Sequence, residues 1–513
     1  MATPESSLKS VSVVSLLSFA HLVVQFALQV VLAKYFGASA DMDAYYAAMA
    51  LPTVLSAILT GSLAYAFLPV FVSRREQAGP EAAWSMAMNF VVLLVGVSTA
   101  LALAGTIWAS PIVRHLHPGF SSTQVARTAM LFRVLSWLVL ANSLVGYLQA
   151  LHHSNQRFAL PAASGVVGTC ATLAYVIWRH EADGVVAVAW GVVVGAGVAI
   201  AGQLRLLLAN LKYASWRLDP GTIRCLRLVA PLVLGAAYYR LDPLVDRYLA
   251  SRLPESSIAY IGYAWRLVNA LLIVSTSSLS IVVFPSLAKH TSLHDEAALR
   301  VEVAHAFRFL CFMLVPITLG LIGFSRIVVR DLFERGEFRP EDTTAVAALL
   351  VIYLGAVWGG GVGEVASKVF YAAGNTVLPV VIGVVGFTFG AGLKIALAPR
   401  LGVQGIAAAT SAYYLLNSSA LAAIVVARWG KETVSGVARA ISRYLLATLP
   451  AMVAAYAITQ THWPLRSLCA AAAAVLVYLL VTLAQRDEFA VKMYHFFADQ
   501  MQRLSLNLRP PAR

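Results

Sequence analysis

The chain has 513 residues, of which 59% are hydrophobic and 12% are charged, and its mean hydropathy is +0.75. A soluble fold of this length would expose too much apolar surface, so a soluble enzyme, a disordered chain and a nucleic-acid binder are excluded. The net charge of +14 is therefore expected in loops that face anionic lipid, where membrane proteins concentrate basic residues.

Apolar segments long enough to span a bilayer follow one another along the whole chain. Fourteen spans are predicted, near residues 11–33, 44–72, 84–109, 128–150, 159–178, 184–209, 226–249, 258–288, 303–327, 343–373, 377–398, 404–427, 437–458 and 465–485. The second, eighth and tenth segments are long enough to tilt or break. No cleavable signal peptide is expected, because the first apolar run continues into Lys34 without a small-residue cleavage site.

The distribution of lysine and arginine predicts the orientation. With the N-terminus inside, roughly 21 basic residues fall on the cytoplasmic side against about 13 outside, so both termini are expected in the cytoplasm. After the last span, Phe489, Met493 and Phe497 recur at helical spacing with Lys492 among them. This pattern predicts an amphipathic helix on the cytoplasmic leaflet, acting as a structural anchor rather than a partner-binding element.

A weak internal repeat suggests how the spans are grouped. An offset of 216 residues pairs residues 60–63 with 276–279 and Pro69 with Pro285. Six helices separate the two copies, so both cross the membrane in the same direction, which predicts two bundles related by an axis along the membrane normal. The expected divisions are two six-helix bundles over 1–220 and 221–430, two further spans over 431–486, and the tail 487–513.

Ionisable side chains at membrane depth cost about 2.5–3.5 kcal/mol on insertion scales, so each is a candidate site residue. Arg266 lies inside the eighth span and is the leading candidate for a substrate cavity; snorkelling to the outer interface is the alternative. Arg240, Asp242 and Asp246 lie at the end of the seventh span, with Arg247 beside them. For these residues, ion pairing that fixes the bundle is as good an interpretation as transport.

Three other charged candidates lie elsewhere in the spans. Glu364 and Lys368 are four residues apart on the tenth span and are expected to pair with each other. Asp43 opens the second span and equally fits a helix N-cap. His21, alone on the apolar first span, is expected to be structural.

No motif points to catalysis or to a metal. The four cysteines, Cys170, Cys225, Cys311 and Cys469, lie in or beside apolar runs without CxxC spacing, so they are expected to be packing residues. The sequence has no Walker motif, no HExxH and no catalytic carboxylate pair, so a transporter without cofactor is predicted rather than an enzyme. Glycines at four-residue spacing, such as Gly191 with Gly195 and Gly355 with Gly359, predict close helix packing.

Several strings together resemble one family. They are residues 35–38, 43–45, 245–251, 263–267, 333–338 and 370–376. In this order, over roughly residues 8–430, they resemble the MurJ/MviN-type lipid flippases of the MOP superfamily.

The resemblance implies a multi-pass transporter of the bacterial inner membrane. Its substrate would be a polyprenyl-diphosphate-linked saccharide, moved from the inner to the outer leaflet by alternating access, and its partners would be membrane lipids and a polymerase or glycosyltransferase of envelope synthesis. A cationic cavity would neutralise the diphosphate, and arginine offers the two-pronged donor that suits it.

The sequence also departs from the family pattern. Where lipid II flippases carry arginines and an acidic residue on the first span, the match places Leu22, Leu28 and Gln29; the arginine pair of the second span appears as Ser56 and Ala57. Fewer cations favour a smaller or differently placed anionic head group, so an exopolysaccharide or O-antigen repeat unit is favoured over lipid II. A cation-coupled small-molecule exporter and a non-transporting scaffold of envelope synthesis are two further hypotheses.

Overall fold

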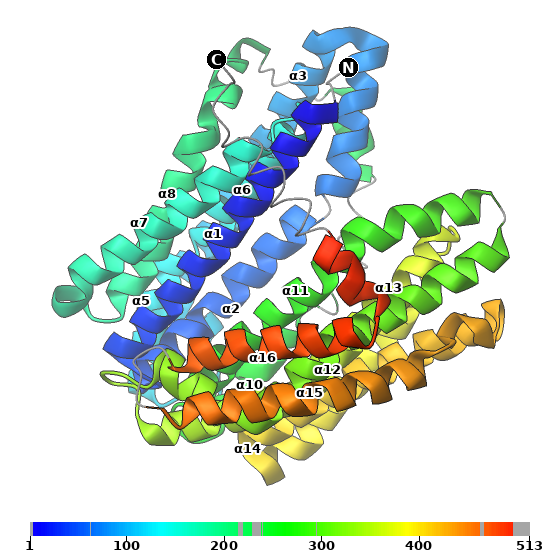
Figure 1. Cartoon of the computed structure of the whole chain (residues 1–513). Helices are drawn as coiled ribbons and strands as arrows, with labels where there is room; N and C mark the ends of the chain where they lie inside the picture. Colours follow the sequence, from blue (N-terminus) through cyan, green and yellow to red (C-terminus); the bar gives the residue numbers. More distant parts are fainter. Residues whose placement is uncertain are drawn as a thin grey trace, which may run out of the picture. The chain divides into compact units, whose positions relative to one another are not determined.

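Helices account for every regular element that the computed structural model describes, and no strand occurs among those residues. The described residues are 4–61, 63–213, 219–227, 238, 240–293, 295–461 and 466–495. At membrane depth the backbone has no water to bond to, so helices, which satisfy their own N–H and C=O groups, are the structure that these apolar segments require. Within these ranges, eleven helices are long and apolar enough to cross a membrane (Figure 1). The predicted all-α polytopic fold is confirmed.

The chain divides into two compact units, each built from three stretches of sequence. The first unit comprises residues 1–264, 332–346 and 387–409, and the second comprises 265–331, 347–386 and 410–513. The division predicted from the repeat consists of two continuous bundles, over 1–220 and 221–430, whereas each of these units joins three separate stretches. The predicted division stays a prediction.

Most of the first unit is a bundle of N-terminal helices. They are α1 (Pro4–Phe36), α2 (Ala40–Gly61), α3 (Leu63–Ile107), α4 (Ala109–Leu116), α5 (Ser122–Leu135), α6 (Leu138–Ser154), α7 (Ala159–Asp183), α8 (Val186–Leu208), the 3-10 turn η1 (Leu211–Tyr213) and α10 (Asp242–Ala250). Helix α7 packs against α8 and α1, and α3 packs against α6. Aromatic rings fill the α3–α6 contact: Phe67 and Phe90 lie 5.1 Å and 5.7 Å from the Tyr147 ring, whose hydroxyl donates to the Ala87 carbonyl at 2.7 Å.

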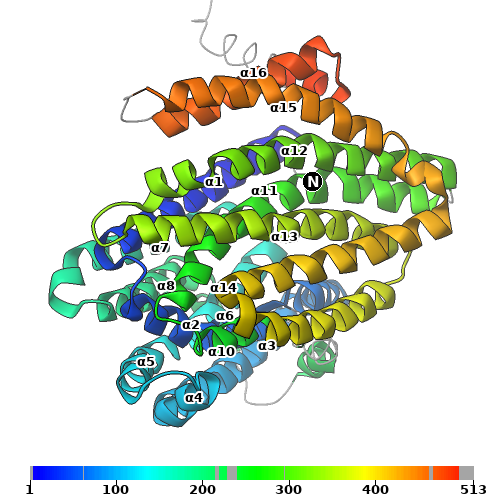
Figure 2. The same cartoon turned by 90° about the horizontal axis from the view of Figure 1, so that it is seen from below.

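The second unit contains the C-terminal helices, two of which begin in the first unit. They are α11 (Ser257–Ser292), α12 (Glu296–Phe333), α13 (Pro340–Ala372), α14 (Val377–Trp429), the 3-10 turn η2 (Lys431–Val434), α15 (Val437–Thr459) and α16 (Arg466–Ala484). Helices α15 and α16 lie side by side (Figure 2).

The predicted close packing at glycines is present in both units. A Cβ added to Gly195 would lie 2.5 Å from the Gly168 carbonyl oxygen on α7, and one added to Gly359 would lie 2.5 Å from the Tyr414 backbone. Neither helix pair could approach this closely with a larger residue.

The count of fourteen spans stays a prediction. Two long helices contain breaks that separate consecutive predicted spans: α3 at Gly79, with φ of 85°, and α14 at Gly402, with φ of 59°. Both glycines adopt a backbone conformation that other residues rarely take. Residues 228–237 and 239 of the predicted seventh span, 226–249, lie outside the described residues.

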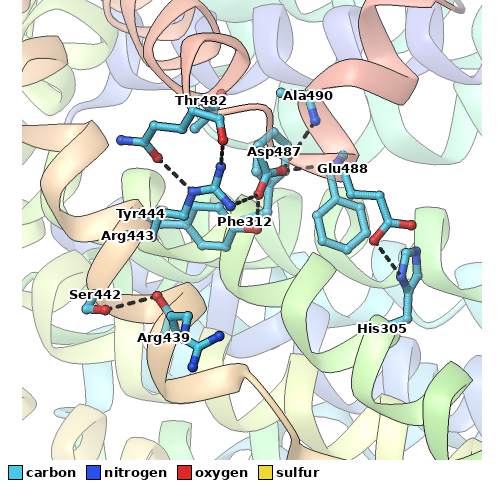
Figure 3. Close-up of polar contacts among 12 residues, drawn as sticks. His305, Phe312, Arg439, Ser442, Arg443, Tyr444, Thr482, Asp487, Glu488 and Ala490 are labelled. Carbon is cyan, nitrogen blue, oxygen red and sulfur yellow. Dashed lines mark hydrogen bonds and ion pairs between the residues drawn. The ribbon is translucent and has the colours of Figure 1, made fainter.

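The chain that follows α16 turns back onto the second unit (Figure 3). Asp487 accepts a hydrogen bond from the Tyr444 hydroxyl at 3.0 Å and pairs with Arg443 at 3.5 Å. Residues 488–495 are helical, and Phe489 packs on Phe312 of α12. The described part of the predicted amphipathic tail therefore binds the protein through its apolar side; residues 496–513 lie outside the described residues.

Candidate functional site

A buried ion cluster joins α10 to α14 within the first unit. The Lys394 ammonium lies 2.5 Å from Asp242 Oδ1 and 2.7 Å from Asp246 Oδ1, and the lysine side chain has no exposed surface. The two aspartates are one turn apart on α10, so a single lysine can reach both. We call these three residues the lysine–aspartate cluster.

The cluster places two of the predicted site residues together with one that sequence reasoning missed. The sequence leaves ion pairing with the neighbouring arginines and a role in transport as equal interpretations of the two carboxylates. The partner that the structure provides is Lys394. A signal was available, because Lys394 is an ionisable residue inside the predicted span 377–398. Its interactions with both carboxylates compensate the high cost of taking three charges out of water.

Arg240 lies two residues before α10 and carries an unused donor. Its guanidinium Nη2 lies 2.7 Å from the position that a Cβ on Gly61 would take, so it packs against the end of α2. Its Nε is buried and has no hydrogen-bond partner among the described residues. A guanidinium N–H without a protein partner can bind an anionic group.

Arg266 lies on α11 in the second unit, directly after the boundary between the units. Its side chain is half-buried, and the part of the chain that the structure describes offers it no hydrogen bond or ion pair. The neighbouring Trp265 is fixed by an edge contact with Tyr353 at 5.4 Å. A cation without a protein partner in an apolar helix is the arrangement that an anionic substrate would complete.

Glu364 and Lys368 pair with each other on α13, as predicted, at 3.1 Å. The Glu364 side chain is 39% exposed and the Lys368 side chain 12%. The pair is an i,i+4 contact within one helix, as the spacing predicts.

Asp43 has a structural role that differs from the predicted cap of its own helix. Its Oδ2 accepts from the Ser256 backbone N–H and its Oδ1 from the Ala259 N–H, both at 2.7 Å. These are the N-cap and third residues of α11, so the carboxylate caps a helix that starts more than 200 residues later. Asp43 is only 3% exposed, and both its oxygens are occupied.

Further hydrogen bonds tie the same end of the first unit together. The Tyr260 hydroxyl donates to Asp342 Oδ1 at 2.9 Å, and the Tyr263 hydroxyl donates to the Gly37 carbonyl at 2.9 Å. The Glu337 N–H donates to the Lys34 carbonyl at 3.0 Å. The α1–α2 turn, the start of α11 and the loop before α13 therefore form one hydrogen-bonded group, which we call the end latch.

Two of the five substituted family positions are closed to a substrate. Ser56 is buried and its hydroxyl donates to the Pro52 carbonyl at 2.6 Å. Gln29 is also buried and accepts from the Tyr46 hydroxyl at 3.2 Å. Both side chains are used in helix packing.

The described ranges hold no group of three or more histidine, cysteine, aspartate or glutamate residues placed to bind a metal ion. Of the predicted site residues, Arg240 and Arg266 are the two with donors left to bind a ligand within the part of the chain that the structure describes. Together with the helical architecture, they define a polytopic membrane protein of the transporter class.

The comparisons with known proteins narrow this class. The family model described as lipid II flippase MurJ matches residues 32–474, and the chain therefore belongs to the MurJ family. Curated relatives include the probable lipid II flippase MurJ of Bdellovibrio bacteriovorus, 25% identical over 73% of this chain and 74% of the relative. The lipid II flippase MurJ of Burkholderia cenocepacia is 26% identical over 71% and 72%.

Solved structures agree on the fold. A lipid II flippase MurJ in an inward closed conformation covers 92% of this chain and 99% of its own, with 20% identity and a TM-score of 0.79. An inward-facing multidrug resistance MATE family transporter of the MOP superfamily covers 82% and 99%, with 14% identity and a TM-score of 0.69. The fold is thus shared by transporters with different cargo, and the cargo must be argued from the site.

Proposed function

We propose that this protein is a flippase that moves a polyprenyl-diphosphate-linked saccharide of the lipid II type from the inner to the outer leaflet by alternating access. Such a head group cannot cross about 30 Å of hydrocarbon without a polar path. The observation that carries the proposal is Arg266, a half-buried guanidinium without a partner among the described residues of a MurJ-family chain.

Arginine suits this substrate for a specific reason. A diphosphate presents several oxygens in fixed geometry, and a guanidinium can donate two parallel N–H bonds to them. Arg266 is the proposed diphosphate ligand in the second unit, and Arg240 is a candidate in the first. Asp242 and Asp246 are already bonded to Lys394, Asp43 to α11 and Glu364 to Lys368, so we assign these carboxylates to structure rather than to substrate.

The end latch fits the proposed cycle. With both termini in the cytoplasm of a bacterium, the α1–α2 turn would lie at the outer face of the inner membrane. The bonds from Asp43 to Ser256 and Ala259 would then keep that face closed, and releasing the head group outward would require them to break. The two repeat-related bundles predicted over 1–220 and 221–430 would supply the rocking movement.

The candidate substrates differ in their support. Both curated relatives described above are lipid II flippases by name, which favours lipid II over an exopolysaccharide or O-antigen unit despite the reduced number of arginines. The MATE-like fold leaves a small-molecule exporter as the second candidate. A polymerase or glycosyltransferase partner in envelope synthesis is part of the proposal only through the family resemblance.

The test is transport of lipid II in proteoliposomes by the Arg266→Ala variant. Loss of a charge-assisted contact is expected to slow transport about 10- to 100-fold, while the unfolding temperature stays that of the wild type. Arg266→Lys should restore part of the rate. The matched control is Arg75→Ala, which removes an exposed cation of α3 close to the break at Gly79 and should transport normally.

Two results would contradict the proposal. Wild-type transport by Arg266→Ala would remove the assigned ligand. A wild-type protein that moves no lipid-linked saccharide, but exchanges a small organic cation, would transfer the chain to the exporter class.

A further inference from the structure

A cavity of about 420 Å³ lies beside the end latch, within the first unit. Its walls are the start of α2, the first turns of α5 and the loop that precedes α11. The polar side chains that line it are Ser121, Thr123, Gln124, Arg127 and Glu255. Its volume is that of a small-molecule site, and its lining differs from the arginines assigned above to the diphosphate. We call it the latch pocket.

The three walls of the latch pocket are bonded to one another. Asp41 of α2 pairs with both terminal nitrogens of Arg127 on α5. The Ser256 N–H donates to Asp43 of α2 at 2.7 Å, which fixes the loop that carries Glu255. The pocket is therefore formed before a ligand arrives, and binding requires little ordering of its walls.

The latch pocket presents charges of both signs. The Glu255 side chain is exposed and has no hydrogen bond or ion pair among the described residues. Arg127 is 49% exposed, and Asp41 engages one N–H of each terminal nitrogen, so the guanidinium keeps further N–H donors for a second carboxylate. One guanidinium and two carboxylates leave a negative charge in excess. A phosphate is therefore disfavoured in the pocket, and an ammonium group is attracted.

From this juxtaposition we propose that the latch pocket binds a zwitterionic peptide, with its ammonium group on Glu255 and a carboxylate on Arg127. The occupant is the peptide part of a saccharide–peptide head group that has crossed the membrane, because the pocket opens at the outer face in the proposed topology. Thr123 and Gln124 add a hydroxyl and an amide for the peptide groups. This inference rests on the proposed function and extends it, since it gives the peptide a site separate from that of the diphosphate.

An occupied latch pocket would hold the outer face closed. A ligand that contacts both Arg127 and Glu255 joins α5 to the loop before α11, and both segments are already bonded to α2. A ligand stabilises the conformation that it binds. The flipped head group would therefore favour closure of the outer face over its own re-entry.

The first experiment measures binding without the lipid. The probe is a soluble disaccharide–pentapeptide with a free amine on the peptide, titrated onto the purified protein by calorimetry. Glu255→Gln should bind it about tenfold more weakly than the wild type, the change expected for one lost charge-assisted hydrogen bond. Glu181→Gln removes an exposed carboxylate near the end of α7 and is the matched control, which should bind normally.

Two results of this titration would overturn the proposal. One is the absence of binding by the wild type at concentrations up to about 1 mM. The other is equal affinity of the wild type and Glu255→Gln.

The second experiment identifies the group that Glu255 contacts. Acetylating the peptide amine should weaken binding to the wild type about tenfold and leave binding to Glu255→Gln unchanged, because both changes remove the same contact. Equal weakening in the two proteins would show that the amine does not bind Glu255. Competition by the disaccharide without its peptide would show that the pocket does not recognise the peptide.

The third experiment tests the link to the end latch. Hydrogen exchange at the Ser256 and Ala259 amides, which are bonded to Asp43, should slow when the probe saturates the wild type. It should not slow in Glu255→Gln at the same probe concentration. Unchanged exchange in the saturated wild type would overturn the proposed closure.

These readouts are independent of transport. Normal lipid II transport by a protein that does not bind the probe would overturn this inference and keep the proposed function. Probe binding that depends on Glu255, in a protein that moves no lipid-linked saccharide, would overturn the proposed function and keep the peptide site.

Discussion

Each unit contains a lysine–carboxylate ion pair, and the two are buried to different degrees. The lysine–aspartate cluster lies in the first unit and the Glu364–Lys368 pair in the second. Lys394 has no exposed surface and links α10 to α14, whereas Glu364 is 39% exposed and meets Lys368 one turn along its own helix. Two charges 4 Å apart attract by only about 1 kcal/mol in water and by several times that in a protein. We therefore infer that the cluster fixes helices and that the α13 pair contributes less to stability.

The largest expected effect is that of Lys394→Met. The substitution leaves Asp242 and Asp246 buried one turn apart without their shared counter-ion. Breaking a buried ion pair in this way costs about 3–5 kcal/mol. We expect the unfolding temperature in detergent to fall sharply.

A second variant separates lost charge pairing from lost packing. Adding Asp242→Asn and Asp246→Asn to Lys394→Met removes all three charges at similar volume, and most of the lost stability should return. If Lys394→Met alone melts like the wild type, the cluster is not desolvated and the contrast with α13 fails.

A histidine near Arg247 of α10 gives a pH test. His117 follows α4, outside the candidate spans, and is 2% exposed. Its burial, helped by the charge of Arg247, lowers the pKa of His117 from 6.5 to about 4. The folded state therefore keeps the ring neutral, so its contribution to stability is present above pH 6.5 and is lost as the pH falls to about 4. The loss amounts to about 3 kcal/mol.

The measurement compares unfolding temperatures of the wild type and His117→Gln between pH 7 and pH 4. The wild type should lose stability faster on acidification, so the difference between the two proteins should change with pH. His115→Gln, an exposed neighbour on α4, should keep the wild-type dependence. A constant difference between the wild type and His117→Gln would contradict the prediction.

A smaller effect is expected at the end latch. Asp43→Ala removes both acceptors at the start of α11 and should cost about 1–2 kcal/mol, as for a lost helix cap. Asp43→Asn retains one acceptor and should lose less. Since the bonds belong to one closed face in the proposed cycle, hydrogen exchange at the Ser256 and Ala259 amides should quicken in Asp43→Ala. Unchanged protection there would show that the latch does not depend on this carboxylate.

Hydropathy allowed the helices to be predicted because the signal is local. Twenty consecutive apolar residues require a helix wherever the chain folds, and the close approach at Gly195 follows equally from local spacing. The pairing of Glu364 with Lys368 was also predictable, since both lie on one helix.

Partners across long separations were not predictable from one sequence. Asp43 caps a helix that begins at Ser257, and Asp242 is bonded to a lysine 152 residues away. Sequence order suggested the nearby arginines instead, because only neighbours along a helix can be paired by spacing. Arg240 and Arg266 were found by their depth alone, which identifies ionisable residues but not their partners.

The smallest effect on the unfolding temperature is expected for a change in the Glu364–Lys368 pair of α13. Glu364→Gln removes one charge from an i,i+4 pair whose carboxylate side chain is 39% exposed, and an i,i+4 pair on a helix contributes about 0.3–0.5 kcal/mol to stability. The unfolding temperature should therefore stay close to that of the wild type, in contrast to Lys394→Met. A loss of stability as large as that of Lys394→Met would mean that the α13 pair is as deeply desolvated as the lysine–aspartate cluster, and that exposure does not distinguish the two.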